Sequence, residues 1–171
     1  PTPLAGDGRW QVSPAASADY RTRILVRRPG DVADFGGTVV LEWLNVSGGL
    51  DADPEWTFLH VELIRSGVAW VGVSAQRGGI FPGDDPISEL LALTAADPVR
   101  YGTLEHPGDD HSYDIFAQVG DLVRAAPASV LGELRPTRVL AVGESQSAFR
   151  LTTYVDAHGP DAPFDGYLLH S

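Results

Sequence analysis

Short apolar segments with strand character alternate with longer segments of helical character along most of this chain. The strand-like segments are rich in β-branched and apolar residues and lie at Thr38–Leu44, Ala69–Val73, Arg138–Val142 and Gly166–Leu169. Strands that alternate with helices are joined by right-handed crossovers and form a parallel sheet covered on both faces. The alternation therefore predicts an α/β fold in which these four segments are neighbouring strands of one mostly parallel sheet.

Three helices between these strands are predicted from caps, helix-breaking residues and apolar spacing. The first is expected to begin at Pro54 with Asp53 as its cap, the second has Ser112 as its cap, and the third runs from Gln146 to about Ala157. Apolar residues at helical spacing are expected to form the buried stripes of the first two helices: Trp56, Leu59 and Leu63, then Ile115, Val119 and Leu122.

Turn residues predict the structure of two further segments. The segment Tyr20–Arg28 alternates as a strand does and ends at Pro29 and Gly30, so it is expected to form an antiparallel pair with the Thr38 strand. The segment from Ser74 to His111 holds much of the glycine and proline, so it is predicted to be a long loop with one short helix at Ile87–Ala95.

The composition narrows the classes of partner. The chain has 12 basic residues, all of them Arg, against 23 acidic ones, which gives a net charge of −11. Nucleic acids and anionic membranes are bound by clustered positive charge, so we expect neither as a partner. The absence of cysteine excludes disulfides and Cys-ligated zinc. A small-molecule ligand is the expected partner, while compartment and oligomeric state are not determined by the sequence.

The segment Gly143–Ser147 (GESQS) joins a predicted strand to a predicted helix and places Ser145 at the tip of the turn. This is the context of a nucleophile elbow, in which a strained backbone lifts a serine hydroxyl above the end of the sheet. Gly143 is expected where a side chain would meet the neighbouring strand, and Ser147 stands where glycine is usual. The backbone N–H of Gln146 would face the same space and stabilise an oxyanion. The alternative is an ordinary turn with a capping serine.

A second loop fits this interpretation. The segment Asn45–Gly49 (NVSGG) directly follows the Thr38 strand, where a second oxyanion donor is expected in such enzymes. The backbone N–H of Val46 or Ser47 could supply it. The alternative is a glycine-rich turn that only reverses the chain.

Some of the histidines could in principle bind a metal or take part in catalysis. His106 and His111 lie in the segment HPGDDH beside two aspartates, but without the helical spacing or third histidine that would favour zinc. We therefore predict no metal and no other cofactor. His170 ends the last predicted strand and could reach the edge where an active site would open, most simply as a residue that bounds the pocket.

Six blocks of the sequence carry a resemblance that covers Tyr20–Ser171, nearly the whole chain: TRILVRRP, GTVVLEWLNVSGG, GVAWVGVSAQ, DPVRYGTLEHPGDDHSYDIFAQ, VLAVGESQSAFRLTTYV and FDGYLLHS. Together they resemble a bacterial family of α/β-hydrolase domain proteins. The resemblance implies the α/β-hydrolase fold, with Ser145 as the nucleophile for a carboxylic ester or related acyl bond. Members of that family are longer, so residues 1–171 are expected to be a single truncated domain, with the catalytic acid and histidine beyond the C-terminus.

Two other functions are compatible with the same residues. A non-catalytic α/β module would use the fold only to bind a ligand or as a structural fragment. An acyltransferase would use the same elbow with an acceptor other than water. Reaction of the serine with a fluorophosphonate would separate a hydrolase from a module, and product analysis would separate it from a transferase.

Overall fold

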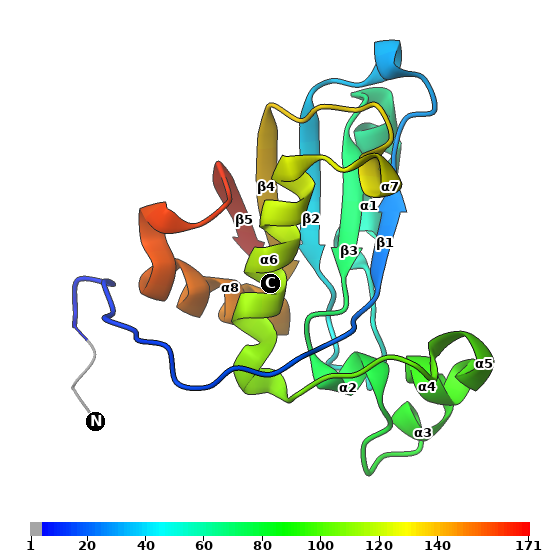
Figure 1. Ribbon diagram of the computed structural model, residues 1–171, viewed down its shortest axis with the longest axis vertical. Coiled ribbons are helices and arrows are strands. Elements are labelled where there is room, and N and C mark those ends of the chain that lie inside the picture. Colours follow the sequence, from blue (N-terminus) through cyan, green and yellow to red (C-terminus); the bar gives the residue numbers. More distant parts are fainter. Residues whose placement is uncertain (1–4) are drawn as a thin grey trace.

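The computed structural model describes residues 5–171. The strands form one five-stranded sheet in the order β1-β3-β2-β4-β5. Strands β3, β2, β4 and β5 are parallel, and β1 runs antiparallel to β3 (Figure 1). The mostly parallel sheet predicted from the sequence is confirmed. The strands are β1 (Ile24–Arg27), β2 (Thr38–Trp43), β3 (Ala69–Val73), β4 (Arg138–Glu144) and β5 (Gly166–His170).

The antiparallel partner of the first strand differs from the one expected. Strand β1 is hydrogen-bonded to β3 and not to β2, with Ile24 opposite Val73. Strand β2 is almost entirely buried and takes the centre of the sheet between β3 and β4, whereas β1 is only half-buried along its length, as suits an edge strand.

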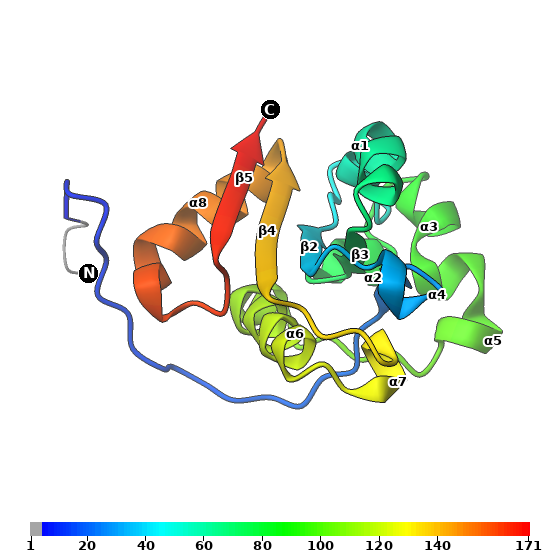
Figure 2. The ribbon, with the colours of Figure 1, turned by 90° about the horizontal axis from the view of Figure 1, so that it is seen from above.

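Helices cover both faces of the sheet (Figure 2). Helix α1 packs on one face, and α6 and α8 pack on the other. The region expected to be one long loop with a single helix instead contains four short helices, α2 to α5. The helices are α1 (Pro54–Arg65), α2 (Arg77–Ile80), α3 (Ser88–Leu91), α4 (Leu93–Ala96), α5 (Pro98–Tyr101), α6 (Ser112–Ala125), α7 (Ala128–Leu131) and α8 (Gln146–His158), with 3₁₀ turns η1 (Val32–Asp34), η2 (Asp109–His111) and η3 (Gly159–Asp161).

The core is divided by the sheet into two apolar clusters. The cluster under α6 and α8 is the larger and includes Trp43, Phe116 and Leu151. The cluster under α1 is smaller and contains Trp70 and Leu63. Side chains alternate across a sheet, so residues of one strand that are two apart face the same helix layer.

Two of the predicted buried positions are wrong. Leu59 of α1 is 36% exposed, because α1 contacts the sheet through a narrower stripe that includes Trp56 and Leu63. Leu122 of α6 is 37% exposed, and Val123 is buried in its place. Apolar spacing identifies the face of a helix, but the direction from which the helix meets the sheet decides which edge of that face is covered.

Asp53 stands at the N-cap position of α1 as predicted, whereas the cap of α6 is His111 and not the predicted Ser112. Ser112 is the first residue of α6, not its cap, and Asp53 makes no capping hydrogen bond to α1. The first turn of α1 is capped from the sheet, because the carboxylate of Glu42 in β2 accepts hydrogen bonds from the N–H groups of Glu55 (3.0 Å) and Trp56 (3.1 Å). This cap joins residues from two elements, so local sequence signals do not reveal it.

Candidate active site

Ser145 lies in the sharp turn between β4 and α8 and has strained backbone geometry. Its φ is 55° and its ψ is −117°, a combination that non-glycine residues rarely adopt and that costs about 1–3 kcal/mol. The Ser145 N–H donates to the carbonyl oxygen of His170 at 2.8 Å, which ties the turn to the end of β5. Its side chain caps no helical N–H. The strain therefore presents the hydroxyl of Ser145 at the C-terminal edge of the sheet.

The residues two positions away on each side must be small because α8 packs closely against the end of β4. A Cβ on Gly143 would lie 3.0 Å from the carbonyl carbon and Cβ of Ser147 and from a methyl group of Leu151. The collision is thus with the following helix and not, as expected from the sequence, with the neighbouring strand. Ser147 is fully buried, and its hydroxyl has no hydrogen-bond partner among the described residues.

The loop after β2 is joined to the Ser145 turn by the side chain of Asn45. Its Nδ2 donates to the carbonyl oxygen of Glu144 at 2.9 Å, and its Oδ1 accepts from the N–H of Ser47 at 2.9 Å. The Ser47 amide is therefore not free to bind an oxyanion. Among residues 5–171, no acceptor contacts the N–H of Val46 or of Gln146, so these two of the three predicted donors stay available.

A hollow of about 340 Å³ lies between this loop, the N-terminal end of α1 and the Ser145 turn. The two predicted oxyanion loops therefore lie at the same edge of the sheet, where parallel sheets gather functional groups. The volume of the hollow is at the small end of the range for ligand pockets. The lining residues are Asn45, Ser47, Ala52, Asp53, Pro54, Thr57, Phe58, Glu144 and Ser145.

The far end of the same loop is fixed to the residue before β1 and the residue after β3. Asp51 is ion-paired with Arg23 at 2.9 Å and accepts a hydrogen bond from the hydroxyl of Ser74. Burial raises the pKa of the Asp51 carboxyl, and its hydrogen bonds with Ser74 and Arg23 oppose that rise. The loop is thus held at both ends, by Asn45 and by Asp51, which limits movement of the Val46 amide between them.

A hydrogen-bond network supports the turn from the α6 side of the sheet. The buried side chain of Gln76 accepts from Trp43 Nε1 (3.0 Å) and from Gln146 Nε2 (2.9 Å), and it donates to Asp109 Oδ2 (3.0 Å). Asp109 also accepts from the N–H of Arg77 (2.8 Å) and from the guanidinium of Arg150 in α8 (3.3 Å). The HPGDDH segment is therefore a brace for the helix that follows Ser145.

Replacing Asp109 with asparagine should lower the free energy of unfolding by roughly 1–2 kcal/mol, because one oxygen that accepts hydrogen bonds becomes a donor and the ion pair with Arg150 is lost. The side chain of the exposed neighbour Asp110 has no hydrogen-bond partner among the described residues, so Asp110→Asn should change stability by less than about 0.5 kcal/mol. Urea unfolding of both variants measures this. Equal effects of the two changes would contradict the assigned brace.

Two of the histidines considered in the sequence analysis, His106 and His170, make structural contacts. His106 donates from Nε2 to the carbonyl oxygen of Ala75 (3.0 Å) and accepts at Nδ1 from the N–H of Gly108 (3.2 Å), so both ring nitrogens are occupied. His170 Nε2 contacts Glu55 Oε1 at 2.6 Å. Within residues 5–171, no histidine is hydrogen-bonded to the Ser145 hydroxyl, and no group of three or more potential metal ligands is found.

Carboxylates gather on the α1 side of the Ser145 turn. Glu42 is fully buried and also accepts from Trp70 Nε1 at 2.8 Å. Burial raises the pKa of Glu42 to about 7, although its hydrogen bonds with the Glu55 and Trp56 amides and with Trp70 oppose the rise. Glu55, next to it, is also buried and is paired with His170. Neither group lines the hollow beside Ser145, but both lie at the helix end that closes it.

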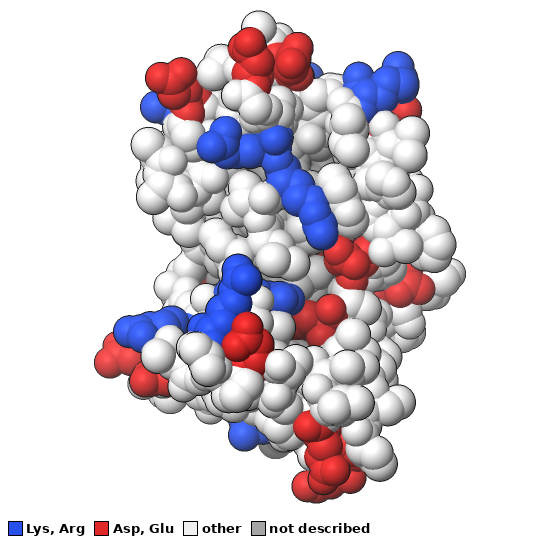
Figure 3. Space-filling view, turned by 90° about the vertical axis from the view of Figure 1, so that its right-hand side faces the viewer, with Lys and Arg blue, Asp and Glu red and all other residues white. Residues whose placement is uncertain are grey.

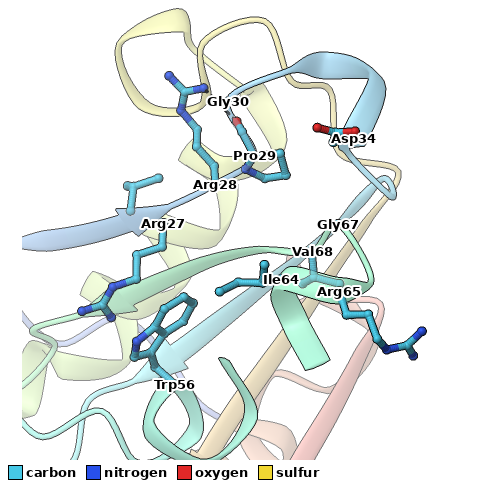
Figure 4. A pocket seen from close by; sticks show the side chains of 11 residues that line it. Arg27, Arg28, Pro29, Gly30, Asp34, Trp56, Ile64, Arg65, Gly67 and Val68 are labelled. Carbon is cyan, nitrogen blue, oxygen red and sulfur yellow. Dashed lines mark hydrogen bonds between the residues drawn. The ribbon is translucent and has the colours of Figure 1, made fainter. Parts of the chain in front are cut away.

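A larger hollow lies at the other end of the sheet, on the side of the molecule where β1 forms the edge (Figure 3). It has a volume of about 910 Å³ and lies between β1, the last turn of α1 and the segment leading into β3. The Arg27 guanidinium lies beside the Trp56 ring, 4.3 Å from its centre, while Arg28 and Arg65 extend away from the middle of the hollow (Figure 4). Two of its charged side chains are paired outside the hollow, Arg27 with Asp53 and Arg65 with Glu62.

The sequence model of a protein family described as Alpha/beta hydrolase domain matches residues 2–171. The chain belongs to the α/β-hydrolase domain family. This confirms the fold class and the resemblance to α/β-hydrolase domain proteins, and it makes this α/β-hydrolase domain a member of a hydrolase family. The comparison of this chain with curated proteins found no match. No described helix of the domain is both long and apolar enough to cross a bilayer.

Proposed function

We propose that this α/β-hydrolase domain hydrolyses a carboxylic ester or a related acyl bond, with Ser145 as the nucleophile. The observation that carries the proposal is the strained backbone of Ser145 between β4 and α8, with φ of 55°. Strain of this kind is kept where the rest of the fold compels it, and such positions cluster at active sites. An otherwise unremarkable turn would relax to an ordinary conformation.

In the proposed reaction, the hydroxyl oxygen of Ser145 bonds to the acyl carbon of the ester and loses its proton to a general base. The carbonyl oxygen then carries the negative charge, and the N–H groups of Gln146 and Val46 stabilise it. Collapse of this intermediate breaks the bond to the alcohol, which leaves with a proton, and water then releases the acid from Ser145. No described residue is assigned as the general base.

The surroundings of Ser145 support this assignment. The N–H of Gln146 belongs to the first turn of α8, where unpaired amides and the helix dipole favour negative charge. The Val46 amide lies in a loop that Asn45 ties to the residue before Ser145. Both donors are thus held in place before a substrate arrives, which is the condition for effective electrostatic stabilisation.

A fluorophosphonate probe should form a covalent adduct with the full-length native protein, and peptide mass spectrometry should locate it on Ser145. The probe reacts with a serine whose hydroxyl is activated, whereas an ordinary turn serine does not react. Heat-denatured protein is the control and should give no adduct. An adduct on another serine, or none on the folded protein, would contradict the proposal.

A further inference from the structure

The hollow beside Ser145 is bordered by negative charge and by no basic side chain among the residues that line it. Two of its lining residues are acidic, Asp53 and Glu144, and the others are uncharged. Asp53 is partly neutralised by Arg27 at 3.1 Å. Glu144 has no ion pair among the described residues and is half-buried. Glu144 is therefore the main uncompensated charge at the entrance to Ser145.

The position of Glu144 in β4 directs its side chain to the α1 side, where the hollow lies. Val142, two residues earlier, packs in the apolar cluster under α1, and alternation puts Glu144 on the same face. Glu144 also stands opposite His170 in the parallel pair of β4 and β5. It immediately precedes Ser145, so any group that enters the hollow to reach the hydroxyl passes close to this carboxylate.

The charges behind the hollow do not reverse this sign. Glu42 caps the first turn of α1, and burial raises its pKa to about 7, so it carries its proton below that pH. Glu55 is paired with His170, which carries charge only when protonated. The basic groups on this side, Arg27 and His170, are each matched by a carboxylate, and Glu144 is not. The whole chain carries a net charge of −11, which adds to the same field.

We infer that the site selects small esters by charge, accepts uncharged or cationic groups beside the scissile bond and disfavours anionic ones, with Glu144 as the specificity-determining residue. The inference rests on the proposed role of Ser145. An anion in the hollow would lose water and face the carboxylate of Glu144 without a cation to compensate. An uncharged group avoids this penalty, and a cationic group gains from the same field. The volume of about 340 Å³ admits a single small ring or a short chain.

The test uses three acetate esters that share the acyl group and differ in the charge on the aryl alcohol: 4-acetoxybenzoate, 4-acetoxybenzamide and (4-acetoxybenzyl)trimethylammonium. The value of kcat/KM is measured for each with the full-length native protein and with Glu144→Gln. Dividing the variant's value by the native value for each ester cancels the intrinsic reactivity of the esters. The matched control is Glu133→Gln, which removes one exposed carboxylate in the turn before β4, at the opposite edge of the sheet.

Glu144→Gln should raise the ratio of kcat/KM for the anionic ester to that for the amide by about tenfold, the effect of one unit charge a few ångström away in a partly hydrated site. The same change should lower the relative rate of the cationic ester, and Glu133→Gln should change neither ratio. If the variant does not fold, the three rates are measured instead with the native protein in buffer containing about 0.5 M salt. Screening by the salt should bring the three relative rates closer together.

An unchanged ratio in a folded Glu144→Gln protein, or a native preference for the anionic ester, would overturn the inference. Ser145→Ala separates this failure from failure of the proposed function. If Ser145→Ala loses activity toward all three esters while the charge ratios do not respond to Glu144→Gln, only the charge selection is wrong. If Ser145→Ala keeps native activity, both proposals are wrong.

Discussion

Replacing Ser145 with alanine is expected to lower kcat for p-nitrophenyl acetate by about 10⁴-fold or more in the full-length native protein. The alanine variant keeps the Gln146 and Val46 amides and the hollow but has no oxygen to attack the acyl carbon. What remains is the catalysis that binding and oxyanion stabilisation provide without a nucleophile. Initial rates measured at saturating substrate, with the uncatalysed rate subtracted, give the comparison.

The chain provides a matched control for this experiment two residues away. Ser147 belongs to the same GESQS segment but is fully buried, and its hydroxyl has no partner among the described residues. Ser147→Ala removes an unsatisfied polar group, so it should leave both activity and stability close to native. If Ser147→Ala loses activity and Ser145→Ala keeps it, the nucleophile is Ser147 and the assignment of Ser145 is wrong.

The second large effect expected is a decrease of stability as the pH rises, caused by Glu42. The folded protein holds the Glu42 proton up to a pKa of about 7, whereas the ordinary value is 4.5. Below pH 4.5 both folded and unfolded states bind the proton. Between the two values the unfolded chain releases it and the folded protein does not, so the free energy of unfolding falls with rising pH. The total loss is roughly 3 kcal/mol, since each pH unit contributes about 1.4 kcal/mol.

Denaturant unfolding at several pH values between 5 and 8 tests this for the native protein and for Glu42→Gln. Glutamine does not titrate, so the Glu42→Gln curve should lack the decrease that Glu42 causes, whatever its absolute stability. Groups that titrate in both proteins contribute equally to the two curves, so the difference between the curves isolates the effect of Glu42. The exposed Glu133→Gln variant should keep the native slope. Parallel curves for the native protein and Glu42→Gln would show that Glu42 does not titrate there.

Much of the fold could be predicted because the strands leave strong local signals. Segments such as Ala69–Val73 are short, apolar and rich in β-branched residues, and they alternate with helical segments. What could not be predicted was the neighbour of β1. Its own residues allow pairing with any free edge, and the burial of β2 between two parallel neighbours decided which edge remained.

The candidate site was predicted in part. The turn at Ser145 and the loop after β2 were both found from small residues that directly follow apolar strands, and the structure brings them to one hollow. The hydrogen bond that the Asn45 side chain accepts from the Ser47 N–H was not predicted from the sequence. Asparagine often bonds the backbone N–H two residues later, and this bond competes with a ligand for that N–H. The brace formed by Gln76 and Asp109 was also missed, since its members are far apart in the sequence.

The sequence by itself determined the α/β class, the parallel strands and the position of Ser145 at a strand-to-helix turn. These follow from periodicity and turn chemistry, which act between residues close together along the chain. Only the tertiary structure decided which carboxylates share a space. Glu42 of a strand and Glu55 of a helix are buried side by side, and this burial raises the pKa of Glu42. Glu144, on another strand, supplies the charge beside Ser145. Desolvation and Coulomb interactions depend on distance in space, so they exist only once the chain has folded.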